Sequence, residues 1–253
     1  MRILVADVAI EKGALIEPVA QFLGLGWRRV SPVPQTLKWR GHDVIIRPGI
    51  SIKDAEALKP DFVMGLMSYY GIGRDRAAFY EHFFAKNVPV FTWGNDSEIP
   101  RLMVKVVSGN PVSKRIVFAK PNHPLLQGLK PEDIKTSGDD WRTLVKAVKG
   151  DIGLAYDPDN GSWEIIYLEE HFGTRRWLHY HPWPPPPDKL VDNMLAYMTR
   201  PSRLPAVAGA GGATLAGLAL WLATRNPVYS LVAAAAGGVA GAAIGKRRAR
   251  PRY

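Results

Sequence analysis

The sequence predicts an α/β domain, built on a mostly parallel sheet flanked by helices, followed by a C-terminal α-helical hairpin. Two observations lead to this prediction. Over residues 1–200, short apolar strand-like runs alternate with helix-like runs, which is typical of parallel strands joined by helices. Residues 201–253 then change to two apolar segments rich in Ala and Gly. We therefore expect one domain over 1–200 and a second over 201–253.

The strand-like runs of the first domain are short and apolar, as expected for strands covered on both faces. They lie at residues 2–8, 43–47, 61–66, 88–93, 115–119, 152–156, 162–168 and 176–180. The helix-like runs lie at residues 14–23, 52–58, 74–86 and 189–198. Asp188 is expected to cap the last helix. The DPDNGS turn between Tyr156 and Trp163 predicts an antiparallel hairpin in the second half.

The 253 residues include no cysteine. Disulfides, thiolate metal sites and a cysteine nucleophile are therefore excluded for this sequence. The first residues, MRILVADVAI, resemble a strand and lack the zones of a signal peptide. The many Arg and Pro residues are compatible with a thermophilic source.

The C-terminal region predicts a pair of transmembrane helices. Its two apolar segments, about 204–224 and 227–245, are each close to the roughly 20 residues that cross a bilayer, and only a short turn with Arg225 separates them. We expect a hairpin that enters and leaves the same face of a membrane.

Small residues recur every four positions in both segments, which places them on one face of each helix. They are Gly209, Ala213 and Gly217 in the first segment and Gly237, Gly241 and Gly245 in the second. Such stripes let helices approach closely in lipid and predict self-association through the hairpin. An Ala/Gly-rich hairpin buried inside a soluble assembly remains the alternative, because Ala and Gly are weak membrane anchors.

The charges of the tail predict its orientation. Positive residues flank the two segments, with a cluster at the end formed by Lys246, Arg247, Arg248, Arg250 and Arg252. Positive residues stay on the cytoplasmic side, so we expect the N-terminal domain and the C-terminus there, with the cluster against lipid headgroups. The tail accounts for six of the 33 Lys and Arg residues and no acid, which leaves 27 against 23 in residues 1–203. Membrane lipids are therefore expected partners and nucleic acid is not.

Four segments of residues 1–200 resemble the class I glutamine amidotransferase-like fold, including its trehalose-utilisation-like relatives. They are the opening strand MRILVADVAI, the strand VPVFTWG with GND after it, HPLLQGL from His123 to Leu129, and WLHYHPWPPPPDKLVDNMLAYM from Trp177 to Met198, which holds Asn193 and Tyr197. Their order along the chain matches the family. The resemblance implies a flavodoxin-like, doubly wound α/β domain over 1–200.

The family's catalytic residues do not carry over to this chain. The resemblance implies a cysteine on the sharp turn after the strand, yet Gly94, Asn95 and Asp96 stand there. His181 and Pro182 match the family's His-Pro pair, but Trp183 replaces the glutamate that would orient the histidine. A nucleophile needs a base that is itself held in place. We therefore expect no glutaminase activity.

Other polar residues are candidates for a binding or catalytic cleft at the strand ends, where open α/β sheets bind ligands. The candidates for ligand binding are Asn95, Tyr69, Tyr70 and His179, and the candidates for catalysis are His181, Asp96 and Glu98. With Asp96 or Glu98, the two histidines would be able to move a proton or hold a metal. Alternatively His181 packs beside Trp183 and Asp96 caps a helix. We expect no metal and no cofactor, and we expect Glu169, Glu170 and His171 to form a solvated turn.

We therefore expect a membrane-anchored, non-catalytic domain that binds or scaffolds in a membrane assembly. The alternative is a membrane-bound hydrolase or sugar-processing enzyme that uses His181 with Asp96 or Glu98. A third placement rests on LKWRGHDVIIRPG at residues 37–49, which resembles the N-terminal half of nucleotide-sugar glycosyltransferases. That domain would lack its donor-binding partner.

Overall fold

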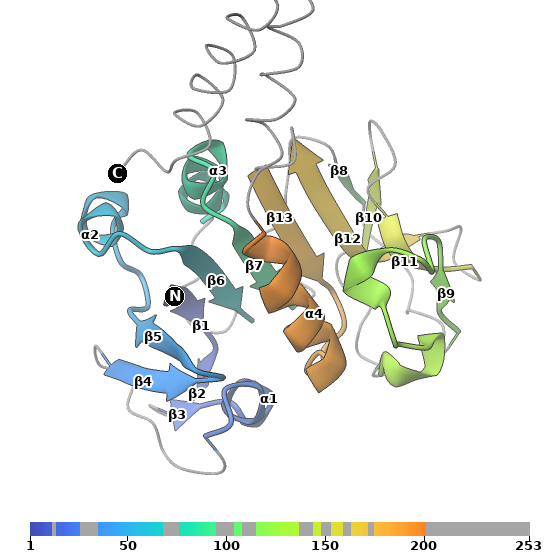
Figure 1. Ribbon diagram of the computed structural model, residues 1–253, viewed down its shortest axis with the longest axis horizontal. Coiled ribbons are helices and arrows are strands. Elements are labelled where there is room, and N and C mark those ends of the chain that lie inside the picture. Colours follow the sequence, from blue (N-terminus) through green and yellow to red (C-terminus); the bar gives the residue numbers. More distant parts are fainter. Residues whose placement is uncertain are drawn as a thin grey trace, which may run out of the picture. The chain divides into compact units, whose positions relative to one another are not determined.

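The computed structural model describes residues 1–11, 14–25, 35–67, 76–94, 104–107, 115–136, 144–147, 153–158, 163–171 and 175–200. Nearly all of these belong to one unit formed by Met1–Glu169 and Arg176–Thr199 (Figure 1). Both predicted hairpin segments, their glycine stripes and the basic cluster lie outside the described residues. Within the described ranges, no helix is long and apolar enough to cross a membrane.

Among the described residues, one sheet of eleven strands organises the domain. Five of its strands are neighbours and run parallel, in the spatial order β5, β1, β6, β7 and β13. They are β1 (Arg2–Val8), β5 (His42–Ile46), β6 (Phe62–Leu66), β7 (Val90–Trp93) and β13 (Arg175–Tyr180). All five were expected from the sequence, with small shifts at the ends of the last four.

The rest of the sheet differs from the prediction. The described pairings of the other six strands are antiparallel, so the sheet is mixed. The prediction of a mostly parallel sheet was therefore wrong. These strands are β4 (Gln35–Trp39), β8 (Val104–Val107), β9 (Val117–Phe118), β10 (Leu144–Ala147), β11 (Gly153–Asp157) and β12 (Trp163–His171). The predicted hairpin across the DPDNGS turn is confirmed, because Asp157 pairs with Trp163.

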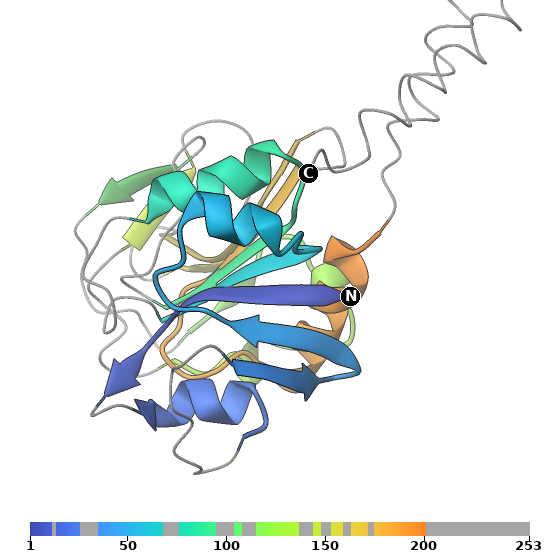
Figure 2. The same cartoon turned by 90° about the vertical axis from the view of Figure 1, so that its left-hand side faces the viewer.

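Helices cover both faces of the parallel strands. The helices α1 (Glu17–Phe22) and α4 (Asp188–Met198) share a core with Ile3 and Val5 of β1. The helices α2 (Ile52–Ala57) and α3 (Ala77–Ala85) pack against Leu4 and Ala6, which point to the opposite face. Figure 2 shows α2 and α3 on one side of β1 and α1 on the other. Burial on both faces explains why β1 is apolar at nearly every position.

The start of the first helix is later than predicted. Ala14–Leu15 forms the strand β3, which pairs with β2 (Ile10–Glu11), and α1 begins only at Glu17 with Pro18 in its first turn. Proline is suited to that position because its fixed φ matches the helix and its missing N–H would have no partner there.

The β4–β5 hairpin was missed because its turn lacks the usual residues. Arg40 and Gly41 link the two strands with φ values of +48° and +79°, and a type I′ turn requires φ > 0 at both positions. Arg40 reaches α4, where it binds Asp188 and donates to Asp192 at 2.6 Å. Asp188 was expected to cap this helix. That prediction was wrong, because Pro187 occupies the N-cap position and Asp188 binds Arg40 instead.

The segment HPLLQGL lies against α4. It contains the short helix η2 (Pro124–Leu126), which His123 begins by accepting a hydrogen bond from the Leu125 N–H. Asn193 of α4 donates to the carbonyls of Leu125 and Gln127 at 3.0 and 2.8 Å. The His123 ring also lies 5.1 Å from the Tyr197 ring. Two segments that carried the family resemblance are therefore joined by direct contacts.

Candidate functional site

The parallel strands end side by side at one edge, where open α/β sheets place their ligands. The chain runs from β1 to β5 on one flank and then returns to β6 on the other, so the direction of winding changes between β1 and β6. Ligands of such sheets bind outside the carboxyl ends of the strands at this switch point. Polar residues at the ends of β1, β6, β7 and β13 are therefore the first candidates.

Asp7 lies at the end of β1 next to the switch point. The register with β6 shifts there, so that Val5 pairs with Met64 but Asp7 pairs with Gly65. This bulge changes the side to which a residue points. Asp7 consequently faces α3, on the same side of the sheet as Leu4 and Ala6. Strict alternation along the strand would have placed its side chain on the opposite side.

The carboxylate of Asp7 is fully buried and binds two residues of the α3 region. Its Oδ2 accepts from Tyr80 Oη at 2.6 Å and from Arg76 Nε at 3.1 Å. Its Oδ1 has no hydrogen-bond partner among the described residues. Burial raises the pKa of Asp7 above its ordinary value, and Tyr80, Arg76 and the Gly49 N–H oppose that rise with smaller effects. The Gly49 N–H itself donates to the Ala6 carbonyl at 3.0 Å.

Arg76 is held in place from three sides. Besides Asp7, its guanidinium donates to the Ile50 carbonyl at 2.9 Å and lies 4.2 Å from the centre of the Phe79 ring. The residue stands directly before α3, at the positive end of the helix dipole. A fixed cation, a helix N-terminus and a buried carboxylate therefore occur together at the end of β1.

Two residues of β6 shape the same region. A Cβ on Gly65 would lie 2.9 Å from Tyr80 Cζ and closer still to its hydroxyl, so glycine is needed for Tyr80 to reach Asp7. Met67 follows β6 with a φ of +53° and is almost fully buried. That backbone region costs about 1–3 kcal/mol for a residue with a side chain and is often found at functional sites.

His179 lies on β13 and is fully buried on the α3 side of the sheet. Its Nδ1 is 2.8 Å from Thr92 Oγ1, which also accepts from the Trp177 indole at 2.9 Å. The threonine hydroxyl has one proton, and donating it to Nδ1 satisfies all three groups. Neutral His179 then carries its own proton on Nε2, which has no partner among the described residues. Burial, with a smaller effect of His181, keeps the pKa of His179 well below its usual value.

His181 follows the last residue of β13. Its N–H donates to the Ile165 carbonyl at 2.9 Å, and its ring lies 6.0 Å from the ring of His179. Neither ring nitrogen has a hydrogen-bond partner in the described part of the chain. Burial lowers the pKa of His181 to about 4, so the imidazole is neutral at physiological pH. The Trp93 indole donates to the Pro182 carbonyl at 2.7 Å and fixes the chain after the histidine.

The structure therefore describes only some of the predicted site residues. His179 and His181 lie together, next to the end of β7, where the Gly94 N–H donates to the Tyr180 carbonyl at 3.0 Å. Asn95, Asp96, Glu98, Tyr69 and Tyr70 lie outside the described residues. Whether Asp96 or Glu98 meets the histidines stays a prediction.

One prediction for this region was wrong. Glu169, Glu170 and His171 were expected in a solvated turn, but β12 continues to His171 and the Glu169 side chain is fully buried. Glu170 alone is exposed. Three consecutive polar residues do not look like a strand in the sequence, but in β12 neighbouring side chains point to opposite faces, so Glu169 is buried while Glu170 is exposed.

Asp7, Arg76 and Tyr80 were missed at the sequence level. The signal for Asp7 was one acid within the otherwise apolar run ILVADVAI at residues 3–10. Its partners are 69 and 73 residues later, too far for a local pattern to connect them.

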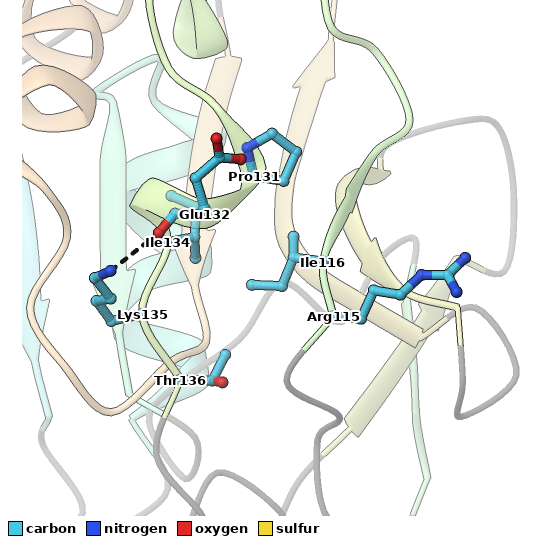
Figure 3. A pocket seen from close by; sticks show the side chains of 7 residues that line it. All are labelled: Arg115, Ile116, Pro131, Glu132, Ile134, Lys135 and Thr136. Carbon is cyan, nitrogen blue, oxygen red and sulfur yellow. Dashed lines mark hydrogen bonds between the residues drawn. The ribbon is translucent and has the colours of Figure 1, made fainter.

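No metal site is found in the described ranges, where no three His, Cys, Asp or Glu side chains lie close enough to share an ion. A hollow of about 430 Å³ lies away from these strand ends, beside β9 and the short helix η3 (Pro131–Asp133) (Figure 3). It is lined by Arg115, Ile116, Pro131, Glu132, Ile134, Lys135 and Thr136. Its polar groups partly serve the loop itself, since Lys135 donates to the Glu132 carbonyl at 3.2 Å.

Comparison with known proteins adds no relative from which a role could be transferred. No protein-family model matches the chain, and no curated protein matches its sequence. The geometry and chemistry of the strand ends are therefore the basis for inferring a role.

Proposed function

We propose that residues 1–200 form a non-catalytic, amidotransferase-like binding domain that the C-terminal hairpin anchors in a membrane. The domain then acts as a binding or scaffold protein in a membrane assembly, with self-association through the glycine stripes. The order of the five parallel strands supports the fold part of this proposal. Numbered along the chain, they are arranged 2-1-3-4-5, which is the flavodoxin-like order of doubly wound folds.

His181 carries the functional part of the proposal. A catalytic histidine needs a pKa near the working pH and a second group that orients its ring. The pKa of His181 is lowered to about 4, and its ring nitrogens have no partner in the described chain. Without a cysteine in the sequence, a buried histidine of this kind fits a structural role better than a role as general base.

The proposal is tested with the full-length chain in lipid vesicles, incubated with glutamine, activated esters and aryl glycosides. We expect hydrolysis at the rate of the vesicle blank, both for the wild type and for His181→Gln. Turnover that His181→Gln abolishes, while its unfolding temperature stays within a few degrees, would contradict the proposal. Chemical cross-linking in native membranes tests self-association, and a result of monomers alone would remove that part.

A hydrolase or sugar-processing enzyme is the second candidate, and one contact favours it. The Gly94 N–H donates to the Tyr180 carbonyl, so the last described residue before Asn95, Asp96 and Glu98 lies beside the residue that precedes His181. If the assay above detects turnover, this candidate predicts that Asp96→Asn or Glu98→Gln reduces it by at least about 100-fold, the usual contribution of a general acid or base. Variants that keep full turnover would exclude these carboxylates.

A further inference from the structure

The end of β1 combines several features that a plain buried ion pair does not require. The bulge turns Asp7 toward α3, and Gly65 leaves the space through which Tyr80 reaches it. Met67, at the end of the neighbouring strand, holds a φ of +53° although it is buried. All of them lie at the switch point, which is the ligand position of open α/β sheets.

The hydrogen bonds of Asp7 are asymmetric. Tyr80 and Arg76 both donate to Oδ2, while Oδ1 has no hydrogen-bond partner among the described residues. The Gly49 N–H also lies near the carboxylate, but its hydrogen bond goes to the Ala6 carbonyl at 3.0 Å. A buried oxygen without a donor costs roughly 1–3 kcal/mol, more if it is charged, and such atoms are rare in native structures. The fold therefore keeps one strong acceptor unused at this position.

We propose that Asp7 Oδ1 accepts a hydrogen bond from an uncharged O–H or N–H group of a small polar ligand bound at the switch point, beside the N-terminus of α3. The proposal rests on the proposed function, a binding domain, and names the group that would recognise the ligand. A carboxylate oxygen has only lone pairs to offer, so the ligand must supply the proton.

The charges around Asp7 favour an uncharged donor. Arg76 lies 3.1 Å from Oδ2 and already compensates the carboxylate, so a cationic ligand would meet a second positive charge. An anionic ligand would meet the carboxylate itself. Hydroxyl and amide groups avoid both repulsions. Because the Asp7 side chain has no exposed surface, a ligand reaches Oδ1 only when the groups that cover it move aside, which favours a small molecule or the narrow end of a larger one.

Asp7→Asn tests the proposal without removing the contacts of the native carboxylate. The asparagine oxygen can still accept from Tyr80 and Arg76, which places the NH₂ group where Oδ1 stood. The variant thereby replaces an acceptor with a donor at the proposed ligand position. Asp43→Asn is the matched control, because Asp43 is a half-exposed carboxylate that binds Lys38 and lies beside the start of β1, at the other end of the strand from Asp7.

The experiment measures probe binding by saturation-transfer NMR on the full-length chain in lipid vesicles. Acetamide and ethylene glycol are the donor probes, and N,N-dimethylacetamide and 1,2-dimethoxyethane are their counterparts without an N–H or O–H. We expect the wild type and Asp43→Asn to bind the donor probes at least about tenfold more tightly than the methylated ones, as for one hydrogen bond to a charged acceptor. Asp7→Asn should lose this preference.

A second readout requires no variant. In the wild type labelled with ¹³C at aspartate carboxyl groups, acetamide should shift the Asp7 resonance, and N,N-dimethylacetamide should not. Absence of that shift, equal binding of donor and methylated probes, or an unchanged preference in Asp7→Asn would each overturn the proposal. The hydrolysis assay above separately decides the proposed function, because turnover would contradict that function whatever the probes do.

Discussion

Tyr80 donates to Asp7 Oδ2 at 2.6 Å, and it reaches the carboxylate because the residue of β6 in register with Asp7 is Gly65. The contact joins α3 to the end of β1 across 73 residues of sequence. It also fixes one oxygen of Asp7, while the other, Oδ1, is buried without a hydrogen-bond partner among the described residues.

Gly65→Ala should weaken the domain through this contact. The new Cβ would lie 2.9 Å from Tyr80 Cζ, and the tyrosine ring has little room to move in its buried position. Overpacking of this kind costs about 1–3 kcal/mol of unfolding free energy. Denaturant titration of the full-length chain by tryptophan fluorescence measures it.

Tyr80→Phe is the matched partner of that variant. It removes the hydroxyl that the new methyl group meets, so Gly65→Ala should cost less in the Tyr80→Phe background than in the wild type. Strictly additive effects would show that the methyl group and the hydroxyl do not compete for space.

Asp7 should make the domain less stable as the pH rises. Its pKa in the folded state is above the ordinary 3.8, so the folded chain holds this proton more tightly than the unfolded chain does. The contribution of Asp7 is therefore fully present below about pH 3.8 and is lost as the pH rises through the folded pKa. Measured from pH 4 to 7, the unfolding free energy of the wild type minus that of Asp7→Asn should fall. A flat or rising difference would contradict the burial of the ionised group.

His181 should have the opposite effect. Its pKa falls from 6.5 in the unfolded chain to about 4 in the folded one, so its stabilising contribution is present above pH 6.5 and is lost as the pH falls toward 4. This difference between the folded and unfolded pKa corresponds to about 3 kcal/mol of unfolding free energy. His181→Gln should remove most of this loss between pH 7 and 4.5, whereas His171→Gln, at the half-buried end of β12, should keep it. Equal acid sensitivity in wild type and His181→Gln would contradict the assignment.

Asn193 should matter for stability through its two donors. Its side-chain NH₂ group bridges the carbonyls of Leu125 and Gln127. Asn193→Ala should cost about 1–3 kcal/mol because both carbonyls lose a partner, and Asn193→Asp should cost more because a carboxylate would face two acceptors. Asp192→Asn, on the exposed side of the same helix, should stay within about 1 kcal/mol of the wild type. Differential scanning fluorimetry ranks the three variants, and equal melting temperatures would show that the bridge adds nothing.

The parallel half of the fold was predictable because its strands are buried on both faces. Every residue of β1 from Ile3 to Val8 is buried, and a continuous apolar run is the pattern such burial produces. Strand direction was not predictable in the same way. β4 and β5 join through Arg40 and Gly41, and no familiar turn pair marks that hairpin.

The candidate site was only half predictable for a related reason. His179 lies on β13 and His181 directly follows its last residue, so their common location follows from the period of a strand. The role of Asp7 depends on a bulge, on the missing side chain of Gly65 and on Tyr80 from another element. Contacts of that kind arise only when the chain is folded.

We propose that residues 204–245 hold the binding domain at a membrane. The most direct test is flotation after carbonate extraction, comparing the full-length chain with a chain ending at Arg203. We expect only the full-length chain to float with the lipid, because its two apolar segments are each long enough to span a bilayer. If both chains stay in the aqueous fraction, the membrane anchor is wrong and the hairpin is an assembly helix pair instead.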